Sequence, residues 1–280
     1  MKVATDWKDY IVLKTANGEK MERIGGFTFL RPDPQVIWGT DKQLSTKVDA
    51  CYKRIENKSG EWKLNPKMPK SFTIERKGTK FHIEPMSFKH ICLFPEQAAN
   101  WDIMKDLIIK SKREIKVLNL FAYTGGASVE CALAGASVTH VDAAKSMIDV
   151  AKQNASLNGI NNIRYILEDC IKFVEREIRR GNKYDAIIMD PPSFGRGPKG
   201  ETWKIEENIF DFVKLCAQVL SDKPLFVLIN SYTTGLQPTV MANILNATIS
   251  GGKTESYELC LPTEENGIYL PCGCSALKTF

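Results

Sequence analysis

The strongest constraint on the fold is an alternation that begins near Pro95 and continues through most of the chain. Apolar runs of five or six residues alternate with longer stretches that have helical spacing, a pattern typical of β-α units around a parallel sheet. The runs are 116–120, 137–141, 163–167, 184–189 and 225–229. A helix near 238–249 and late strands near 256–261 and 272–278 follow. We therefore predict a doubly wound, Rossmann-like α/β sheet of seven strands.

The first part of the chain has short runs with a period close to two, separated by turns. Residues 71–75 and 80–84, for example, flank the turn Lys77-Gly78-Thr79, which predicts a hairpin. We therefore predict a small β-rich N-terminal domain over residues 1–90 and an α/β domain over residues 91–280.

The basic excess of the chain lies in its first hundred residues. Residues 1–100 hold 18 Lys and Arg against 12 Asp and Glu, whereas residues 101–280 hold 20 against 21. Six of these cations fall close together: Lys63, Lys67, Lys70, Arg76, Lys77 and Lys80. A positive surface here would suit a polyanion such as RNA, and a merely solvated surface explains the run equally well.

Several features of the sequence predict a cytoplasmic protein with no membrane segment and no metal site. There is no apolar run of about 18 residues, and the first twenty residues carry charge throughout. The eight cysteines are scattered and show no C-x-x-C spacing. Cys272 and Cys274 are expected to be small apolar side chains of a strand, and we assign them no role.

The ends of the predicted strands are where such a sheet binds ligands. The first strand closes with residues 119–127, N-L-F-A-Y-T-G-G-A. Glycine between a strand and a helix lets the backbone approach a ligand closely and exposes helix N–H groups. The loop has only Gly125-Gly126 and lacks G-x-G-x-x-G, which disfavours a dinucleotide.

Carboxylates stand at the next three strand ends. Asp142 follows the second strand, Glu168 and Asp169 follow the third, and Asp190 follows the fourth. A carboxylate at the second strand end can accept hydrogen bonds from ribose hydroxyls, and one at the third can accept an adenine amino hydrogen. Each of these acids alone is more often a helix cap. Together with the glycine loop they favour a nucleoside ligand.

Residues from about 90 to 280 resemble class I S-adenosylmethionine-dependent methyltransferases, and most closely the bacterial group with the large-subunit ribosomal RNA methyltransferases. The resemblance is carried by N-L-F-A-Y-T-G-G (119–126), Val141-Asp142, Glu168-Asp169 and D-P-P-S-F (190–194), with an echo at 267–270. It implies S-adenosyl-L-methionine as cofactor, with its methionine part in the 121–126 loop, its ribose on Asp142 and its adenine facing Asp169.

The stretch 94–101, which contains Gln97, resembles the segment that these proteins place across the cofactor, although a helix start that docks two domains is an equal alternative. The predicted cofactor-binding residues are Gln97, Asn119, Phe121, Ala122, Tyr123, Thr124, Gly125, Asp142, Ala143, Glu168, Asp169, Cys170 and Asp190.

The segment Asp190-Pro191-Pro192-Ser193-Phe194 is predicted to face the methyl acceptor and supplies the predicted catalytic residues Asp190, Pro191, Pro192 and Phe194. The prolines fix the backbone, Asp190 can accept a hydrogen bond from a base, and Phe194 can stack on one. A rigid loop with Phe194 in the core is the alternative. Arg196, Lys199 and Lys204 could meet phosphate or simply form a loop.

The target atom is predicted from an absence in the sequence. Methylation of a pyrimidine carbon needs a thiolate nucleophile, and neither 190–197 nor 228–233 contains a cysteine. A purine nitrogen is therefore favoured. The predicted function is methylation of a base in ribosomal RNA, either free or in an assembling subunit. A small-molecule or protein acceptor, or a non-catalytic protein that binds the cofactor and RNA, remains an alternative.

Overall fold

The computed structural model describes residues 1–39, 44–45, 47–55, 58–86, 88–196 and 202–280. The chain divides into two compact units. The N-terminal unit contains residues 2–99 and 259–272, and the α/β unit contains Met1, 100–258 and 273–280. The predicted domains, 1–90 and 91–280, remain a prediction.

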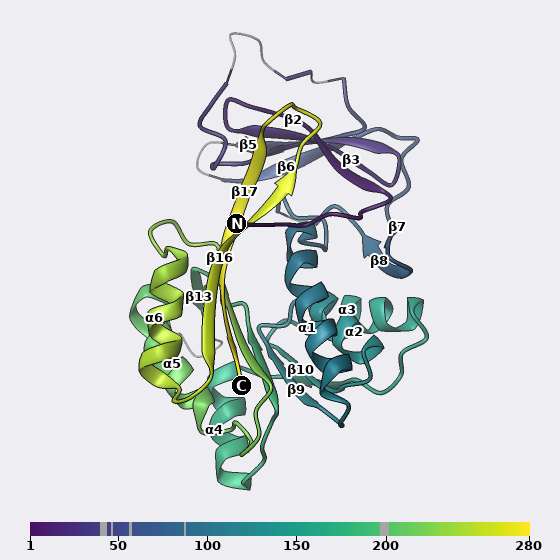
Figure 1. Ribbon diagram of the computed structural model, residues 1–280. Helices are drawn as coiled ribbons and strands as arrows, with labels where there is room; N and C mark the ends of the chain where they lie inside the picture. The colour runs from purple at the N-terminus through teal and green to yellow at the C-terminus, as the bar shows by residue number, and fades with distance from the viewer. Residues whose placement is uncertain (40–43, 46, 56–57, 87, 197–201) are drawn as a thin grey trace. The chain divides into compact units, whose positions relative to one another are not determined.

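The predicted α/β sheet is confirmed (Figure 1). The seven expected strands have the order β16-β17-β15-β12-β9-β10-β11, and β17 runs antiparallel to β15. Their bounds are β9 (Lys116–Leu120), β10 (Ser137–Asp142), β11 (Arg164–Leu167), β12 (Ala186–Met189), β15 (Phe226–Ser231), β16 (Lys253–Pro262) and β17 (Tyr269–Thr279). A two-residue strand, β1 (Lys2–Val3), pairs with Leu259 and Cys260 of β16 as an eighth strand.

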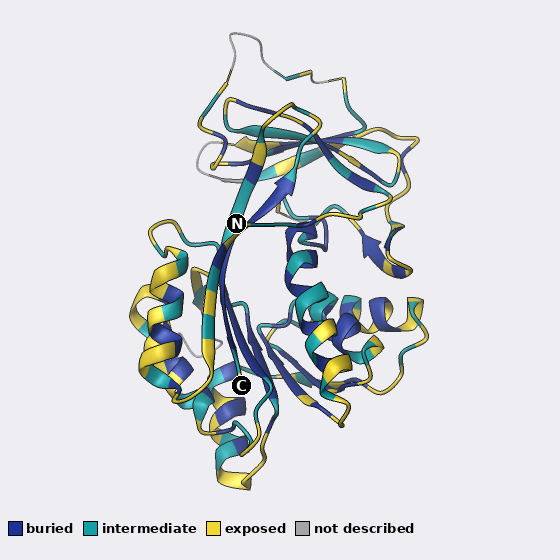
Figure 2. Cartoon of the chain, viewed as in Figure 1, coloured by how far each residue is buried: buried dark blue, intermediate teal, exposed yellow. Residues whose placement is uncertain are grey.

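Six α-helices accompany this sheet in the described part of the chain. They are α1 (Ala98–Ser111), α2 (Gly126–Leu133), α3 (Lys145–Leu157), α4 (Cys170–Arg180), α5 (Ile205–Ala217) and α6 (Pro238–Thr248). Figure 2 shows that the central strands are buried along their length, whereas the helices are buried along one side only. An apolar core joins β12 and β15 to α4, α5 and α6, with Phe173 and Phe212 among its buried rings.

The N-terminal unit is built on a five-stranded sheet of order β2-β3-β4-β5-β6, in which β4 and β5 are parallel. Its strands are β2 (Tyr10–Ala16), β3 (Glu19–Ile24), β4 (Phe27–Pro32), β5 (Ala50–Ile55) and β6 (Lys58–Leu64). A separate hairpin joins β7 (Phe72–Arg76) to β8 (Thr79–Ile83), as the sequence predicts. Its turn places Lys77 and Gly78 at φ 48° and 84°.

A buried ion pair lies in the core of this sheet. Glu22, 0% exposed, accepts hydrogen bonds from Nε of Arg31 at 2.7 Å, from Nη2 at 2.8 Å and from the Tyr10 hydroxyl at 2.6 Å. Burial alone would raise the pKa of Glu22, but the charges of Arg31 and Lys20 and these hydrogen bonds lower it to about 2. The pair is therefore charged at neutral pH.

One predicted surface cation is not on the surface. Arg76 is only 1% exposed, donates from Nε to the carbonyl of Thr5 at 2.9 Å and lies 5.9 Å from the ring centroid of Trp7. Its placement in a positive docking surface is therefore wrong, because an arginine with these contacts supports the core of the unit. Lys67 and Lys70 are exposed, and Lys77 forms an exposed ion pair with Asp6.

The described residues contain neither a candidate membrane span nor a candidate metal site. None of their helices has the length and the apolar character that crossing a bilayer requires. Nor does any group of three or more His, Cys, Asp or Glu side chains among them stand close enough together to hold a metal ion.

Candidate active site

The register of the parallel strands brings their carboxyl ends to one edge of the sheet. Leu120, the last residue of β9, pairs with Val141 on one side and with Met189 on the other, and Asp142 pairs with Leu167. The residues that follow these strands therefore emerge next to one another. This edge is where open α/β sheets bind their ligands.

The loop after β9 has an unusual backbone. Phe121 and Tyr123 have φ values of 53° and 50°, a region that bulky residues rarely adopt, and Gly125 has φ 80°. The N–H of Phe121 donates to Sγ of Cys170 at 3.2 Å, and the N–H of Tyr123 donates to Oδ2 of Asp142 at 2.8 Å. Such strain persists only where the surroundings impose it, and it is concentrated at ligand-binding loops.

Asp142 is the centre of this arrangement. Its Oδ2 accepts from Tyr123, and its Oδ1 accepts from the N–H of Ala144 at 2.8 Å. Burial raises the pKa of Asp142, and hydrogen bonds from the backbone of Ala144, Tyr123 and Ala143 oppose the rise. Each carboxylate oxygen has a second lone pair, so the group can still accept hydrogen bonds from ribose hydroxyls. The site therefore fits the sugar of a nucleoside.

The two glycines of the loop are required by packing. A Cβ on Gly126 would lie 2.7 Å from the ring of Trp101, and one on Gly125 would lie 3.0 Å from Cβ of Ala151. The sequence interpretation attributed the glycines to ligand approach. Contact with α1 and α3 gives them a second reason, which only the tertiary structure reveals.

A buried polar network lies beneath the loop. Nδ2 of Asn119 donates to Oγ of Ser128 at 2.9 Å, and this hydroxyl is 3.0 Å from Nδ1 of His140. Burial lowers the pKa of His140 to about 3, so the imidazole is neutral. Nδ2 of Asn154 donates to the carbonyl of Thr124 at 2.8 Å. Ser128 and Asn154 were missed in the sequence, where their only signal is a polar residue on the buried side of a helix.

The acids after β11 have partners within the protein. Asp169 is the N-cap of α4 and accepts from the N–H of Lys172 at 3.0 Å. Glu168 forms a two-point ion pair with Arg176, with N–O distances of 2.7 and 2.5 Å. Cys170 is buried behind the loop. The structure thus shows that Asp169 caps α4. Its contact with adenine remains a prediction.

The D-P-P-S-F segment leaves the sheet edge beside the loop. The N–H of Asp190 points to the carbonyl of Leu120 at 3.4 Å, Pro191 is buried, and the ring of Phe194 is 53% exposed. The alternative that places Phe194 in the core is therefore wrong. Phe194 begins β13 (Phe194–Arg196), which pairs with β14 (Thr202–Lys204). Lys204 pairs with Glu207 at 2.7 Å, and Lys199 lies outside the described residues.

Trp203 contacts both the loop after β9 and the D-P-P-S-F segment. The sequence analysis did not single it out. Its Nε1 donates to the carbonyl of Pro192 at 2.7 Å. Its ring lies 5.4 Å from that of Phe121 and 5.7 Å from that of Phe212. The strained loop and the D-P-P-S-F segment therefore both contact Trp203, which forms an aromatic cluster with Phe121 and Phe212.

Gln97, the remaining predicted cofactor residue, belongs to the N-terminal unit. It is buried at the end of the short helix η1 (Pro95–Gln97), just before α1 begins. Its contact with the cofactor remains a prediction.

Comparison with known proteins gives this geometry a family context. A family model described as S-adenosylmethionine-dependent methyltransferase matches residues 51–228. The chain is 34% identical over 178 residues to ribosomal RNA large subunit methyltransferase K/L of Pseudoalteromonas atlantica, covering 62% of this chain and 24% of that protein. It is also 34% identical over 143 residues to ribosomal RNA large subunit methyltransferase I of Klebsiella pneumoniae, covering 49% and 35%. The chain thus spans well under half the length of these curated relatives.

Solved structures agree with the fold. A SAM-dependent methyltransferase from Agrobacterium tumefaciens matches with a TM-score of 0.92 and 32% identity, over 99% of this chain and 92% of that one. A Streptococcus mutans protein described as a sam-dependent methyltransferase matches with a TM-score of 0.74 and 17% identity, over 98% and 76%. The second likeness supports the fold alone.

Proposed function

The chain belongs to the family of S-adenosylmethionine-dependent methyltransferases, and we propose that it methylates a base in large-subunit ribosomal RNA. The observation that carries the proposal is the exposed ring of Phe194 on a proline-fixed segment, beside the strained loop after β9. The names of the curated relatives support RNA as the acceptor. In this proposal residues 91–280 catalyse the reaction, and residues 1–90 help to dock the RNA.

The α/β unit would hold the cofactor at the carboxyl edge of its sheet. S-adenosyl-L-methionine supplies an electrophilic methyl group when it is bound. We assign its methionine part to the 121–125 loop, its ribose to Asp142 and its adenine to the end of β11 beside Asp169. The fixed backbone of the loop means that little ordering is needed on binding.

The acceptor base would be held by the D-P-P-S-F segment. A base reaches such a site only when it leaves its helix, and an exposed aromatic ring can stack on its face. Phe194 supplies that ring, and Asp190 accepts a hydrogen bond from the base. The hydrogen bond from Trp203 to the carbonyl of Pro192 fixes the backbone between Asp190 and Phe194. Transfer from a sulfonium needs alignment of the acceptor with the methyl group, and in this proposal these residues provide it.

A purine nitrogen is the target that we favour. A pyrimidine carbon would need a thiolate, and the two cysteines nearest the strand ends are poorly suited to provide one. Burial raises the pKa of Cys170 well above the usual range. Cys274 pairs with Ser231 at the end of β15, and burial raises its pKa to about 11.

The test uses labelled S-adenosyl-L-methionine and ribosomal RNA from a strain that lacks the gene. After digestion, mass spectrometry of the nucleosides identifies the labelled base. We expect a methylated purine from the wild type, a large loss with Asp190→Asn and no loss with Asp211→Asn, an exposed carboxylate on α5. A labelled 5-methylpyrimidine would overturn the choice of purine. No label in free RNA or in ribosomal particles, with cofactor bound, would favour a small-molecule or protein acceptor.

A further inference from the structure

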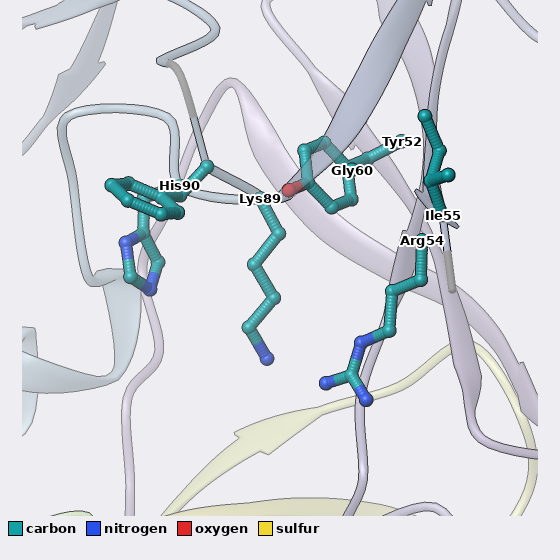
Figure 3. A pocket seen from close by; sticks show the side chains of 7 residues that line it. Tyr52, Arg54, Ile55, Gly60, Lys89 and His90 are labelled. Atoms are coloured by element: carbon teal, nitrogen blue, oxygen red, sulfur yellow. The ribbon is translucent and has the colours of Figure 1, made fainter. Parts of the chain in front are cut away.

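A hollow of about 430 Å³ lies on the N-terminal unit, and its lining residues differ from those assigned to the cofactor and the acceptor. It is formed by the end of β5 and by the segment that follows β8 (Figure 3). The residues that matter are Tyr52, Arg54, Ile55, Phe88, Lys89 and His90. Its volume is within the range of small-ligand pockets, about 300–1,000 Å³.

The walls of the hollow are held in place by Trp62 on β6. Its Nε1 donates to the carbonyl of Met86 at 2.7 Å and to that of Phe88 at 3.0 Å. Its ring packs edge-on against Tyr52, with centroids 5.3 Å apart. These contacts fix the segment that carries Phe88 and Lys89 against the β5–β6 hairpin, so the hollow exists before any ligand arrives.

Two cations lie at the hollow. Figure 3 shows Arg54 and Lys89 extending in the same direction, with the ring of Tyr52 drawn between them. Nζ of Lys89 donates to the carbonyl of Pro32 at 3.2 Å. No ion pair joins Arg54 to another residue in the described part of the chain. The hollow thus presents positive charge, and none of the described residues that line it is a carboxylate.

The surroundings of Lys89 favour an added anion. Burial lowers the pKa of Lys89, the charge of Asp33 opposes this, and the nearby charges of Lys20, Arg31 and Arg54 lower it further. Asp33 already pairs with Lys20 at 3.2 Å. A phosphate beside Lys89 would relieve this repulsion.

Exposed apolar surface lies next to these charges. Phe88 is 59% exposed and Ile55 is 40% exposed. Burial and the charges of Arg31, Lys89 and Lys20 lower the pKa of His90 to about 4, so its ring is neutral at pH 7. Cations combined with exposed aromatic rings are the usual surface for single-stranded nucleic acid, in which bases stack while phosphates pair.

The opposite face of the same hairpin provides an internal comparison. A second hollow of about 460 Å³ contains Lys53, Lys63 and Leu64, and no described residue in its lining is aromatic. Lys53 and Arg54 are neighbours on β5 and line different hollows, as expected for successive residues of a strand. The two faces therefore share positive charge and differ in stacking surface.

We propose that the hollow at Arg54, Phe88 and Lys89 binds an unpaired nucleotide of the RNA substrate, with its phosphate on the two cations and its base on Phe88. This inference rests on the proposed function, because it assumes that the substrate is RNA. It assigns part of the RNA docking to residues outside the group of cations between Lys63 and Lys80.

Binding of a short fluorescein-labelled oligoadenylate, measured by anisotropy without cofactor, tests the inference. Phe88→Ala should weaken binding about fivefold or more, because stacking of one base is lost. Arg54→Glu should weaken it and flatten its salt dependence, because a phosphate contact is lost. The matched controls Leu64→Ala and Lys53→Glu change similar residues on the opposite face and should bind as the wild type does. All four side chains are exposed, so the variants are expected to fold.

An abasic chain of the same length separates stacking from charge. Phe88→Ala should lose affinity for oligoadenylate and leave the weaker binding of the abasic chain unchanged. Equal losses in the controls and in the variants would overturn the site, as would binding of polyglutamate at the same residues in preference to RNA. Methyl transfer to ribosomal RNA, assayed in parallel, keeps the two proposals distinguishable. Transfer that proceeds normally in Phe88→Ala and Arg54→Glu overturns the site alone, whereas absent transfer by a wild type that binds oligoadenylate overturns the proposed reaction alone.

Discussion

Glu22 in the N-terminal unit and Asp142 in the α/β unit are both buried carboxylates, and they differ in what surrounds them. Glu22 is matched by a guanidinium and a hydroxyl, and its pKa falls to about 2. Asp142 accepts hydrogen bonds from the backbone N–H groups of Tyr123 and Ala144, and burial raises its pKa. The charge of Glu22 is neutralised within the protein, whereas Asp142 can still accept hydrogen bonds from a ligand.

The contrast separates residues that hold the fold from residues that serve the site. A carboxylate whose partners all belong to the protein contributes to stability, so its removal should lower the free energy of unfolding. A carboxylate with a raised pKa at a strand end is a candidate for function, so its removal should lower the affinity for a ligand. Four predictions test this division.

The largest effect is expected for Arg31→Met, which leaves Glu22 buried without its cation. Loss of one partner of a buried pair costs about 3–5 kcal/mol. Chemical denaturation should show this loss. Arg23→Met is the control, because Arg23 and Glu264 form a surface pair 3.8 Å apart, and such pairs contribute at most about 1 kcal/mol. Equal losses from both variants would contradict the assignment of Glu22 and Arg31 as the central pair.

The pH dependence of stability should follow the same pair. Because the folded pKa of Glu22, about 2, lies below its usual value of 4.5, its contribution is present above pH 4.5 and is lost as the pH falls toward 2. Unfolding free energies measured across this range should fall more steeply in the wild type than in Glu22→Gln. Parallel curves for the two proteins would show that another group controls the acid transition.

Asp142→Ala should act on binding. We expect affinity for S-adenosylhomocysteine, measured by calorimetry, to fall by about 1–3 kcal/mol, the cost of leaving ribose hydroxyls unpaired. Asp149→Ala removes an exposed carboxylate paired with Lys145 on α3 and should bind normally. Because the pKa of Asp142 is raised, wild-type affinity should decline on acidification at a pH above the usual aspartate range. Unchanged affinity in Asp142→Ala would remove this residue from the site.

Asp169 is expected to give the smallest effect, because it serves both purposes. Asp169→Ala removes the cap of α4 and should cost about 1 kcal/mol of stability. Asp169→Ser keeps a capping oxygen and removes the carboxylate, so stability should stay near wild type while cofactor affinity falls. If Asp169→Ser binds S-adenosylhomocysteine as the wild type does, Asp169 is a cap and nothing more.

The sequence predicted the sheet because its signal is local. The runs ending at Leu120, Asp142, Leu167 and Met189 become parallel strands, since apolar runs between helical stretches have few other ways to be buried. The hairpin around Lys77-Gly78 was predicted for a similar reason, from its turn residues.

What the sequence could not provide depends on contacts between distant residues. From its neighbours in the sequence, Arg76 is predicted to be a surface cation. Its burial is explained by its contacts with the carbonyl of Thr5 and the ring of Trp7, which are distant in the sequence. Trp203 joins the site through Pro192 and Phe121, which no spacing rule would bring together. The hollow beside Phe88 likewise requires the β5–β6 hairpin and the segment after β8 to meet.

A crystal structure with S-adenosylhomocysteine bound would test the central claim most directly. The account predicts the ribose hydroxyls within hydrogen-bond distance of the Asp142 carboxylate, with the homocysteine part in the 121–125 loop. A ligand held elsewhere, with Asp142 bonded only to Tyr123 and Ala144, would contradict the claim that this strand end is the cofactor site.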